Sequence, residues 1–462
     1  MFNRININKV HFVGIGGVGM SGIAEVLHNL GWKISGSDLY ENDYVTHLKK
    51  IGIEIYIGHS AQNLKNVDVV VLSSAIKEDN PELIYAKKNR IPVISRAEML
   101  AELMRLKYSI AIAGCHGKTT TTSLISLILS AAGFDPTFVV GGKINSIGSN
   151  AKLGKSDILV TEADESDGSF LKLFPIVSVI TNIDNDHLDY YKTFDNIKNS
   201  FIEFANKVPF YGCVVICIED KNATSIIKDI NKKVFTYGFS ENANIYAKNI
   251  VFNESSSSFD VYYFGKLLGR IKLNLPGKYN ILNVLGAITV SQIFSVNFDL
   301  IKETLLTYKG VQRRFQIKCN VNNILIIDDY GHHPTEIYNT VEAARLSYPD
   351  KKIICIFQPH RYTRTLLLAK DFGRAFKYAD EIIITDIYAA SEKPIENVDS
   401  NLIIKYIKKS GFKNIEYISE HSEIVNYVLN NIKPNSVILT IGAGNIWKVG
   451  EIIATELMKK YK

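Results

Sequence analysis

The strongest chemical signal in the sequence is a short loop with two glycines followed by Lys and Thr. Its residues are Gly114, Cys115, His116, Gly117, Lys118, Thr119 and Thr120. A strand-like segment (109–113) precedes the loop and a helical pattern (121–132) follows it. At such a helix N-terminus, backbone N–H groups bind phosphate oxygens, a Lys reaches the outer phosphates and a Thr hydroxyl binds Mg²⁺. We expect this phosphate loop to bind ATP.

The phosphate loop is shorter than the usual P-loop. Only Cys115 and His116 separate its glycines, and Ile112 stands where the longer loop would begin. The strand, loop and helix order nevertheless favours a nucleotide site over a chance turn before a Lys.

A second glycine-rich loop lies near the N-terminus and matches the pattern G-x-G-x-x-G. Its residues are Gly14, Ile15, Gly16, Gly17, Val18 and Gly19. It follows a strand-like segment (10–13) and precedes a helix whose N-terminus we place at Ser21. The pattern by itself indicates NAD or FAD, but Gly16 and Gly17 would let any diphosphate approach the backbone. We therefore expect two nucleotides, or one nucleotide and one nucleotide-linked substrate.

Polar residues near this glycine loop are candidates to contact the same ligand. Asp38 ends the next strand-like segment, at the spacing where an acidic residue contacts a ribose. His59, Ser73 and Ser74 lie where such a ligand would pass, although each is also an ordinary polar loop residue.

A strand that ends in carboxylates is the first candidate for metal binding. The segment 157–161 is apolar, and Glu162 follows it, where an acid facing a phosphate loop holds Mg²⁺. We expect Asp164, Glu165 and Asp167 to be solvated or to cap a helix.

His187 is a second candidate metal ligand. It follows the strand-like segment 177–181. Imidazole prefers softer metals than Mg²⁺, so a purely structural role is equally open.

Length and composition limit the class of protein. A chain of 462 residues is expected to form roughly two to four domains. Hydrophobic residues make up 46% and charged residues 22%, as in a globular protein with a full core. The net charge of +6 suits anionic small substrates, but it is not the concentrated basic face that nucleic-acid binding needs.

Cysteine usage and the chain start bear on location. Cys213 and Cys217 are evenly spaced on a strand-like segment and should face the core, and the five cysteines show no metal-type pairing. This is typical of a reducing compartment. No apolar run reaches membrane-spanning length, and residues 1–6 run directly into a strand, which argues against a signal peptide. We expect a cytoplasmic protein without membrane insertion.

Alternating strand-like and helix-like segments predict an α/β fold in three blocks, at 1–107, 108–308 and 309–462. In the central block we expect a turn at 255–258 and a closing helix from Asn280.

The third block begins with a predicted strand at 324–328 and a predicted helix at 334–347. Another strand is expected at 353–357, and His360, Arg361 and Arg364 lie in the loop just past it.

Three motifs of the third block carry a family resemblance: QRRFQ (312–316), DDYGHHP (328–334) and QPHRYTRT (358–365). With the two loops, they make the chain similar to the Mur ligases, the ATP-dependent ligases of peptidoglycan precursors. The resemblance covers nearly the whole chain. It implies an N-terminal Rossmann-like domain for a UDP-sugar, a central P-loop-type ATPase domain and a C-terminal Rossmann-like α/β domain that closes over both.

The resemblance also assigns residues on the ATP side. Thr119, Glu162 and His187 match Mg²⁺ ligands, and Asn280 and Asn283 match asparagines beside the adenine.

Three positions depart from the family pattern. Cys115 stands where Thr is common, and Tyr279 where His is common. Phe201 occupies the place of a carbamylated lysine that holds a second metal in several Mur ligases. Cys115 and Tyr279 touch no role that needs the missing group, since the loop binds through its backbone. The absent lysine, which the alanine-adding members of the family also lack, concerns only the second metal site.

On the amino-acid side, the resemblance implies ligation of L-alanine to the lactyl carboxylate of UDP-N-acetylmuramate through an acyl phosphate. His332, Arg361 and Arg364 match residues that handle the alanine carboxylate and the reacting end of the sugar. A neutral His near pH 7 is a suitable base for the amine, and His332 and His360 are the candidates. We expect the protein to be a monomer or a homodimer.

Three alternatives remain open at this point. An NAD-dependent sugar-nucleotide oxidoreductase would use the glycine loop but leaves Lys118 unexplained. A P-loop transport ATPase or GTPase would use Lys118 but leaves the first block without a role. Within the family, the nearest rival attaches a preformed tripeptide to the same UDP-sugar.

Overall fold

The computed structural model describes residues 9–142, 144–145 and 149–461. Residues 1–6, expected to lead directly into a strand, lie outside this range. The chain forms two compact units, which are described separately: Met1–Tyr246 with Tyr263–Gly265 and Asn283–Thr304, and Ala247–Tyr262 with Lys266–Leu282 and Leu305–Lys462.

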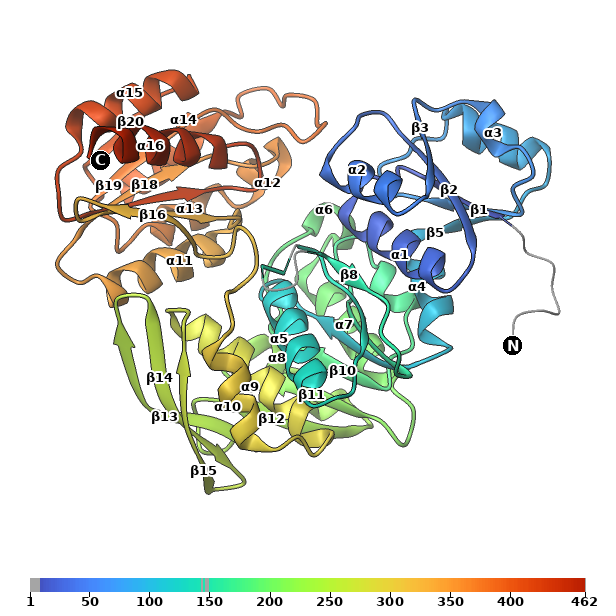
Figure 1. Cartoon of the computed structure of the whole chain (residues 1–462). Helices are drawn as coiled ribbons and strands as arrows, with labels where there is room; N and C mark the ends of the chain where they lie inside the picture. Colours follow the sequence, from blue (N-terminus) through green and yellow to red (C-terminus); the bar gives the residue numbers. More distant parts are fainter. Residues whose placement is uncertain (1–8, 143, 146–148, 462) are drawn as a thin grey trace. The chain divides into compact units, whose positions relative to one another are not determined.

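The N-terminal sheet has five strands in the order β3-β2-β1-β4-β5 (Figure 1, blue). The strands are β1 (Lys9–Val13), β2 (Lys33–Asp38), β3 (Glu54–Ile57), β4 (Val69–Leu72) and β5 (Val93–Ser95). The helices are α1 (Val18–Asn29), α2 (Asp43–Lys50), α3 (Pro81–Lys88) and α4 (Arg96–Met104), with a 3₁₀ turn η1 (Ala61–Leu64). Each pair of neighbouring strands in this sheet is parallel, as the alternation predicts. The order reverses beside β1, and ligands bind at such switch points.

The start of α1 differs from the prediction. The helix begins at Val18 rather than Ser21, and the Ser21 hydroxyl donates to the Val18 carbonyl inside it, at 2.9 Å. The glycines after β1 therefore lead straight into the helix, which brings its positive end closer to the loop.

The central sheet has ten strands in the order β15-β14-β13-β12-β11-β10-β6-β9-β7-β8. The strands are β6 (Tyr108–Ala113), β7 (Thr137–Val139), β8 (Ala151–Lys152), β9 (Ile158–Glu162), β10 (Val177–Ile180), β11 (Cys213–Cys217), β12 (Lys233–Gly238), β13 (Ile245–Asn253), β14 (Ser256–Tyr263) and β15 (Lys266–Leu273). The helices are α5 (Lys118–Ala131), α6 (Leu188–Tyr191), α7 (Phe194–Asn206), α8 (Lys221–Ser225), α9 (Lys278–Ile293) and α10 (Phe298–Leu306), with η2 (Ser169–Lys172) and η3 (Ile227–Asp229). Both cysteines of β11 are buried, as predicted.

Two expectations for the central block are wrong. The turn falls at 254–255 rather than 255–258, because Ser257 is buried in β14 and its hydroxyl donates to the Leu275 carbonyl at 2.9 Å. The helix predicted from Asn280 does not close the block, since α10 follows it.

The C-terminal sheet has six strands in the order β16-β17-β21-β18-β19-β20 (Figure 1, orange to red). The strands are β16 (Gln316–Val321), β17 (Ile324–Asp329), β18 (Lys352–Phe357), β19 (Glu381–Ile384), β20 (Ile415–Tyr417) and β21 (Ser436–Ile441). The helices are α11 (Pro334–Ser347), α12 (Tyr362–Leu367), α13 (Ala369–Ala375), α14 (Ser400–Lys409), α15 (His421–Asn431) and α16 (Trp447–Lys460). The predicted helix at 334–347 is confirmed. Its start is fixed by Pro334 in the first turn and by a capping box between His333 and Glu336.

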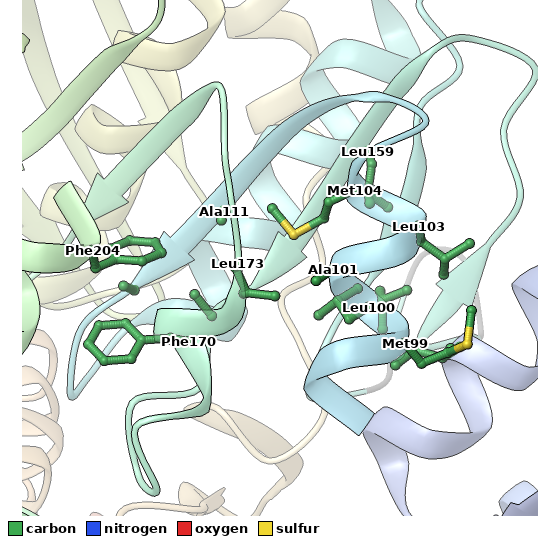
Figure 2. Packing of buried hydrophobic residues seen from close by; sticks show 14 of the residues in the cluster. Met99, Leu100, Ala101, Leu103, Met104, Ala111, Leu159, Phe170, Leu173 and Phe204 are labelled. Atoms are coloured by element: carbon green, nitrogen blue, oxygen red, sulfur yellow. The ribbon is translucent and has the colours of Figure 1, made fainter. Parts of the chain in front are cut away.

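One hydrophobic cluster supports the strand that carries the phosphate loop. Leu100 and Met104 of α4 belong to it, together with Ala111 of β6 and Leu159 of β9 (Figure 2). Helix α4 of the first block thus shares a core with the central strands. In the described part of the chain, no helix has both the length and the apolar character that crossing a bilayer requires.

Three phenylalanines form the aromatic part of this cluster. Phe170 stacks on Phe204 with ring centroids 5.0 Å apart and meets Phe201 edge-on at 5.2 Å. All three are fully buried. Phe201, at the position of the family's lysine, is therefore a core residue of α7.

Replacing Phe204 by Ala should lower the free energy of unfolding by about 3–5 kcal/mol, because a buried ring is lost and a cavity remains. Phe210→Ala is the matched control, since Phe210 is 93% exposed and its loss should change stability by less than about 0.5 kcal/mol. Thermal unfolding followed by circular dichroism measures both. Equal effects of the two variants would contradict the packing described.

Candidate nucleotide and ligation site

The phosphate loop has a backbone that requires both of its glycines. Gly114 has φ +132° and Gly117 has φ +82°. A Cβ on Gly114 would lie 2.1 Å from the Thr181 hydroxyl oxygen, and one on Gly117 would lie 2.4 Å from Asn283 Oδ1. Helix α5 starts at Lys118, so the loop's N–H groups stand at a helix N-terminus, as phosphate binding requires.

The residues after β10 hold the loop in place through His116. The Thr181 hydroxyl and Asn182 Nδ2 donate to the His116 carbonyl at 2.6 and 2.9 Å, and Asn182 Oδ1 accepts the His116 N–H at 2.9 Å. The His116 ring lies 2.9 Å from Asp184 Oδ2. Burial raises the pKa of the Cys115 thiol well above its usual range, so this side chain is a neutral packing group.

Lys118 forms a buried ion pair with Glu165. Its Nζ donates to the two carboxylate oxygens at 2.8 and 2.7 Å and to the Gly114 carbonyl at 2.7 Å. Burial raises the pKa of Glu165 to about 7, and the neighbouring Lys118 opposes that rise. Burial alone would lower the pKa of Lys118, but Glu165 and then Asp164 raise it, so the ammonium stays charged.

The expectation that Glu165 is solvated or caps a helix is therefore wrong. Asp164 forms an ion pair with Arg96 at 2.9 Å, and Asp167 is exposed and accepts from the Ser169 N–H at 3.0 Å. Several acids follow β9, and their spacing does not show which one turns inward.

The predicted metal ligands surround the same loop. Thr119 is buried in the first turn of α5, and Glu162 ends β9, which pairs with β6. Glu162 Oε1 accepts from the Gly141 N–H at 2.6 Å. His187 has φ +57°, and its Nε2 lies 3.9 Å from Glu165 Oε1. The hydroxyl and carboxylate are the oxygen donors that Mg²⁺ prefers, whereas the imidazole is the poorest fit of the three.

The two predicted adenine-side asparagines have different surroundings. Asn283 Oδ1 lies against Gly117 and accepts from the Thr121 hydroxyl at 3.3 Å. Asn280 belongs to the other unit, where its Nδ2 donates to the Pro276 carbonyl at 2.7 Å.

The glycine loop is held by the end of β2. The N–H groups of Gly14 and Ile15 donate to the Ser37 carbonyl at 2.8 and 3.0 Å, and the Gly16 N–H donates to Asp38 Oδ2 at 2.8 Å. Asp38 therefore supports the loop, besides any contact with a ligand. A Cβ on Gly16 would lie 2.8 Å from that oxygen, whereas one on Gly17 meets no atom closer than 3.6 Å.

The other predicted residues of this site lie around the loop. A Cβ on Gly14 would approach Ser73 Cβ to 3.0 Å, so Ser73 borders the loop, while Ser74 is exposed. A Cβ on Gly19 would lie 2.9 Å from Arg96 Nη1, which places this guanidinium on the first turn of α1. His59 follows β3, with its Nδ1 2.9 Å from the Ser37 hydroxyl.

The His and Arg candidates of the third block gather past the carboxyl ends of β17 and β18, which lie on either side of β21 in the sheet. His332 follows β17 and His360 follows β18, with ring centroids 5.6 Å apart. His360 also stacks on Tyr388, which follows β19, with an interplanar angle of 8°. Tyr388 was missed by sequence reasoning, because what marks it is its contact with the ring of His360, which belongs to another part of the chain.

The two arginines differ in conformation. Arg361 has φ +69°, and its N–H donates to the Tyr388 carbonyl at 2.9 Å. Arg361 Nε is buried and has no hydrogen-bond partner among the described residues. Arg364 lies in α12 rather than in the loop as predicted, with Nη1 3.2 Å from His360 Nδ1.

His332 has a backbone carbonyl and, at 3.5 Å, the Glu336 carboxylate beside its Nδ1. Its Nδ1 lies 3.2 Å from the Tyr330 carbonyl oxygen. Because a carbonyl oxygen only accepts hydrogen bonds, this contact favours a proton on Nδ1. The opposite nitrogen, Nε2, then carries the lone pair. A proton can be taken up at that atom.

Two glycine loops that each precede a helix, in the pattern of phosphate-binding loops, and a cluster of His and Arg are the features of a nucleotide-dependent α/β enzyme. Three family models match in turn: "Mur ligase family, catalytic domain" over residues 9–108, "Mur ligase middle domain" over 112–291, and "Mur ligase, glutamate ligase domain" over 313–444. The chain belongs to the Mur ligase family, and its three sheets are those of the three-domain Mur ligase fold.

Individual relatives cover nearly the whole chain. It is 51% identical over 451 residues to a UDP-N-acetylmuramate–L-alanine ligase of Geotalea uraniireducens, covering 98% of both chains. A solved UDP-N-acetylmuramate–alanine ligase of Thermotoga maritima is 29% identical with a TM-score of 0.82, covering 98% of this chain and 99% of that one. A solved murein peptide ligase of Psychrobacter arcticus has a TM-score of 0.71 at 22% identity, covering 97% of this chain and 98% of that one. At this identity the similarity supports the fold only.

Glu165→Ala should lower the free energy of unfolding by about 3–5 kcal/mol without nucleotide, because Lys118 is left as an uncompensated buried charge. The double variant Lys118→Met/Glu165→Leu should regain most of that loss. Asp167→Ala is the control, with an expected change below about 0.5 kcal/mol. Denaturant unfolding measures the series, and a Glu165→Ala variant as stable as the control would contradict the ion pair.

Proposed function

We propose that this protein joins L-alanine to the lactyl carboxylate of UDP-N-acetylmuramate at the expense of ATP, giving UDP-N-acetylmuramoyl-L-alanine, ADP and phosphate. It is a UDP-N-acetylmuramate–L-alanine ligase activity (EC 6.3.2.8) of peptidoglycan precursor synthesis. The observation that carries the proposal is 51% identity over 98% of both chains to a relative with that name. The geometry of the phosphate loop and of the His and Arg cluster supplies the groups that this reaction needs.

The domains divide the substrates among them. Residues 1–107 bind the UDP-sugar, 108–308 bind ATP, and 309–462 close over ATP and the amino acid. The glycine loop, with Asp38, His59, Ser73 and Ser74, takes the UDP part of the sugar nucleotide. The supporting observation is the parallel sheet whose order reverses beside that loop.

ATP is bound by residues 114–120, with Asn280 and Asn283 beside the adenine. Lys118 neutralises the outer phosphates, where negative charge accumulates during transfer. Thr119, Glu162 and His187 would hold Mg²⁺, which supplies further neutralisation when bound.

The lactyl carboxylate is a poor electrophile and must be activated before an amine can attack it. The lactyl carboxylate attacks the γ-phosphorus of ATP, which gives an acyl phosphate and ADP. The alanine amine then attacks the acyl carbon, and the tetrahedral intermediate expels phosphate as the amide forms. His332 takes the amine proton at Nε2, with His360 as the alternative base.

Arg361 and Arg364 bind the alanine carboxylate. A guanidinium presents paired N–H donors to a carboxylate, and the buried Nε of Arg361 offers such a donor. Arg361 lies in the loop after β18 and Arg364 in the helix that follows, and α/β domains build their sites past the carboxyl ends of strands.

We further infer that the enzyme works in the cytoplasm as a monomer or homodimer and has no nucleic-acid partner. All five cysteines are free thiols, as a reducing compartment favours.

The reaction should release phosphate from ATP when UDP-N-acetylmuramate, Mg²⁺ and L-alanine are all present. A preformed tripeptide in place of L-alanine should give little release, and no NADH absorbance change should accompany turnover. Lys118→Ala should lose most activity even at saturating ATP, because the transition state loses a charge-assisted contact. Turnover with tripeptide but not alanine, or without any amino acid, would contradict the proposal.

Arg361→Ala and Arg364→Ala should each raise the KM for L-alanine or lower kcat by about tenfold or more, while the KM for ATP and for the UDP-sugar stays nearly unchanged. Arg361→Lys and Arg364→Lys should restore little of the lost activity with L-alanine, because an ammonium does not reproduce two parallel N–H donors. Arg374→Ala, on α13 of the same domain, is a matched control. Steady-state kinetics with each substrate varied measures the effect. Unchanged alanine kinetics in both Ala variants would reject the carboxylate clamp.

A further inference from the structure

A buried carboxylate in the N-terminal domain has no role in the reaction described so far. Glu82, on α3, is 0% exposed. The Ser37 hydroxyl donates to its Oε2 at 2.6 Å and Asn63 Nδ2 donates to its Oε1 at 2.6 Å. His59 Nδ1 lies 3.1 Å from Oε2, and His11 Nε2 lies 3.6 Å from Oε1.

Such a carboxylate is costly to bury, so its surroundings must favour the charged form. Burial pushes the pKa of Glu82 upward, but the neighbouring His11 ring and the hydrogen bonds from Ser37 and Asn63 outweigh it and lower the pKa below the ordinary value. Glu82 is therefore an ionised acceptor, and each group that faces it must present a proton.

The Glu82 cluster is directly linked to the glycine loop. Ser37 donates its hydroxyl to Glu82, and its carbonyl accepts the N–H groups of Gly14 and Ile15. The Gly58 N–H donates to the Asp38 carbonyl at 2.8 Å, which ties the turn before His59 to the same strand end. The carboxylate that holds the His59 ring thus lies next to the backbone that holds the loop, while the loop itself is held by the Ser37 carbonyl.

The geometry at His59 determines which ring nitrogen is protonated. Nδ1 lies between the Ser37 hydroxyl and Glu82, and the hydroxyl already donates to Glu82. The carboxylate therefore favours a proton on Nδ1 and leaves the lone pair on Nε2. Nε2 has no hydrogen-bond partner within residues 9–142, 144–145 and 149–461, and the side chain is 10% exposed. It is an acceptor beside the proposed nucleotide site.

We propose that Glu82 is a positioning residue for the UDP-sugar: it fixes the Nδ1–H tautomer of His59, so that Nε2 accepts a hydrogen bond from the uridine part of the substrate. The inference rests on the proposed function. The donor on the ligand is an N–H of the base or a hydroxyl of the ribose, which present the same chemistry to an imidazole lone pair.

Kinetics test the proposal. Glu82→Gln and His59→Ala should each raise the KM for UDP-N-acetylmuramate about tenfold, with the KM for ATP and for alanine unchanged. Because Glu82 acts through His59, the double variant should be no worse than His59→Ala alone. Glu25→Gln is the matched control, since Glu25 pairs with His47 at 3.2 Å in the same domain and should leave all three KM values unchanged. Multiplying losses in the double variant, or a normal UDP-sugar KM in Glu82→Gln, would overturn the proposal.

A second measurement uses the unmodified protein and does not depend on the folding of a variant. In ¹⁵N-histidine spectra, Nε2 of His59 should be unprotonated, and its resonance should shift on addition of UDP but not of ATP. CDP, which lacks the N3–H of uracil, tests that N–H as the donor, and 2′-deoxy-UDP tests the ribose 2′-hydroxyl. A proton on Nε2, or UDP binding without a shift at His59, would reject the role of Glu82 alone, whereas absence of UDP binding would also reject the proposed function.

Discussion

The buried pair of Lys118 and Glu165 is the interaction on which the rest of the central site depends. A phosphate loop must present a cation to ATP, yet before ATP binds that cation would be a mostly buried charge without a partner. Glu165 accepts two of its hydrogen bonds and the Gly114 carbonyl accepts a third. The ammonium is therefore kept charged and in place where phosphate oxygens would arrive.

The requirement to hold charged groups at fixed places explains why every site lies at the carboxyl end of parallel strands. The glycine loop follows β1, the phosphate loop follows β6, and the His and Arg cluster follows β17 and β18. At such edges the chain leaves the sheet and can turn its N–H groups and side chains toward a ligand, while the strands behind stay packed. The charged groups are then backed by carboxylates such as Asp38 and Glu165, which set the orientation of the loop and the lysine.

Sequence reasoning predicted the elements well where one physical signal dominates. The helix at 334–347 has a proline and a capping box at its start, and the strand before the phosphate loop is a continuous apolar run. The prediction failed where two signals compete: Ser257 belongs to a serine-rich stretch typical of a turn, but it is buried in β14. Glu165, Glu82 and Tyr388 could not be assigned from sequence, because their roles come from burial and from contacts with residues far away in the chain. The roles proposed for the metal ligands and for the arginines stay predictions.

The central claim is that the sugar carboxylate is activated by phosphoryl transfer before the amine attacks. The most direct test uses UDP-N-acetylmuramate labelled with ¹⁸O in its lactyl carboxylate, with ATP, Mg²⁺ and L-alanine, and mass spectrometry of the released phosphate. An acyl phosphate transfers one carboxylate oxygen to phosphate, so the account predicts one ¹⁸O per phosphate formed. Unlabelled phosphate, with both ¹⁸O atoms found in products other than phosphate, would contradict an acyl phosphate intermediate.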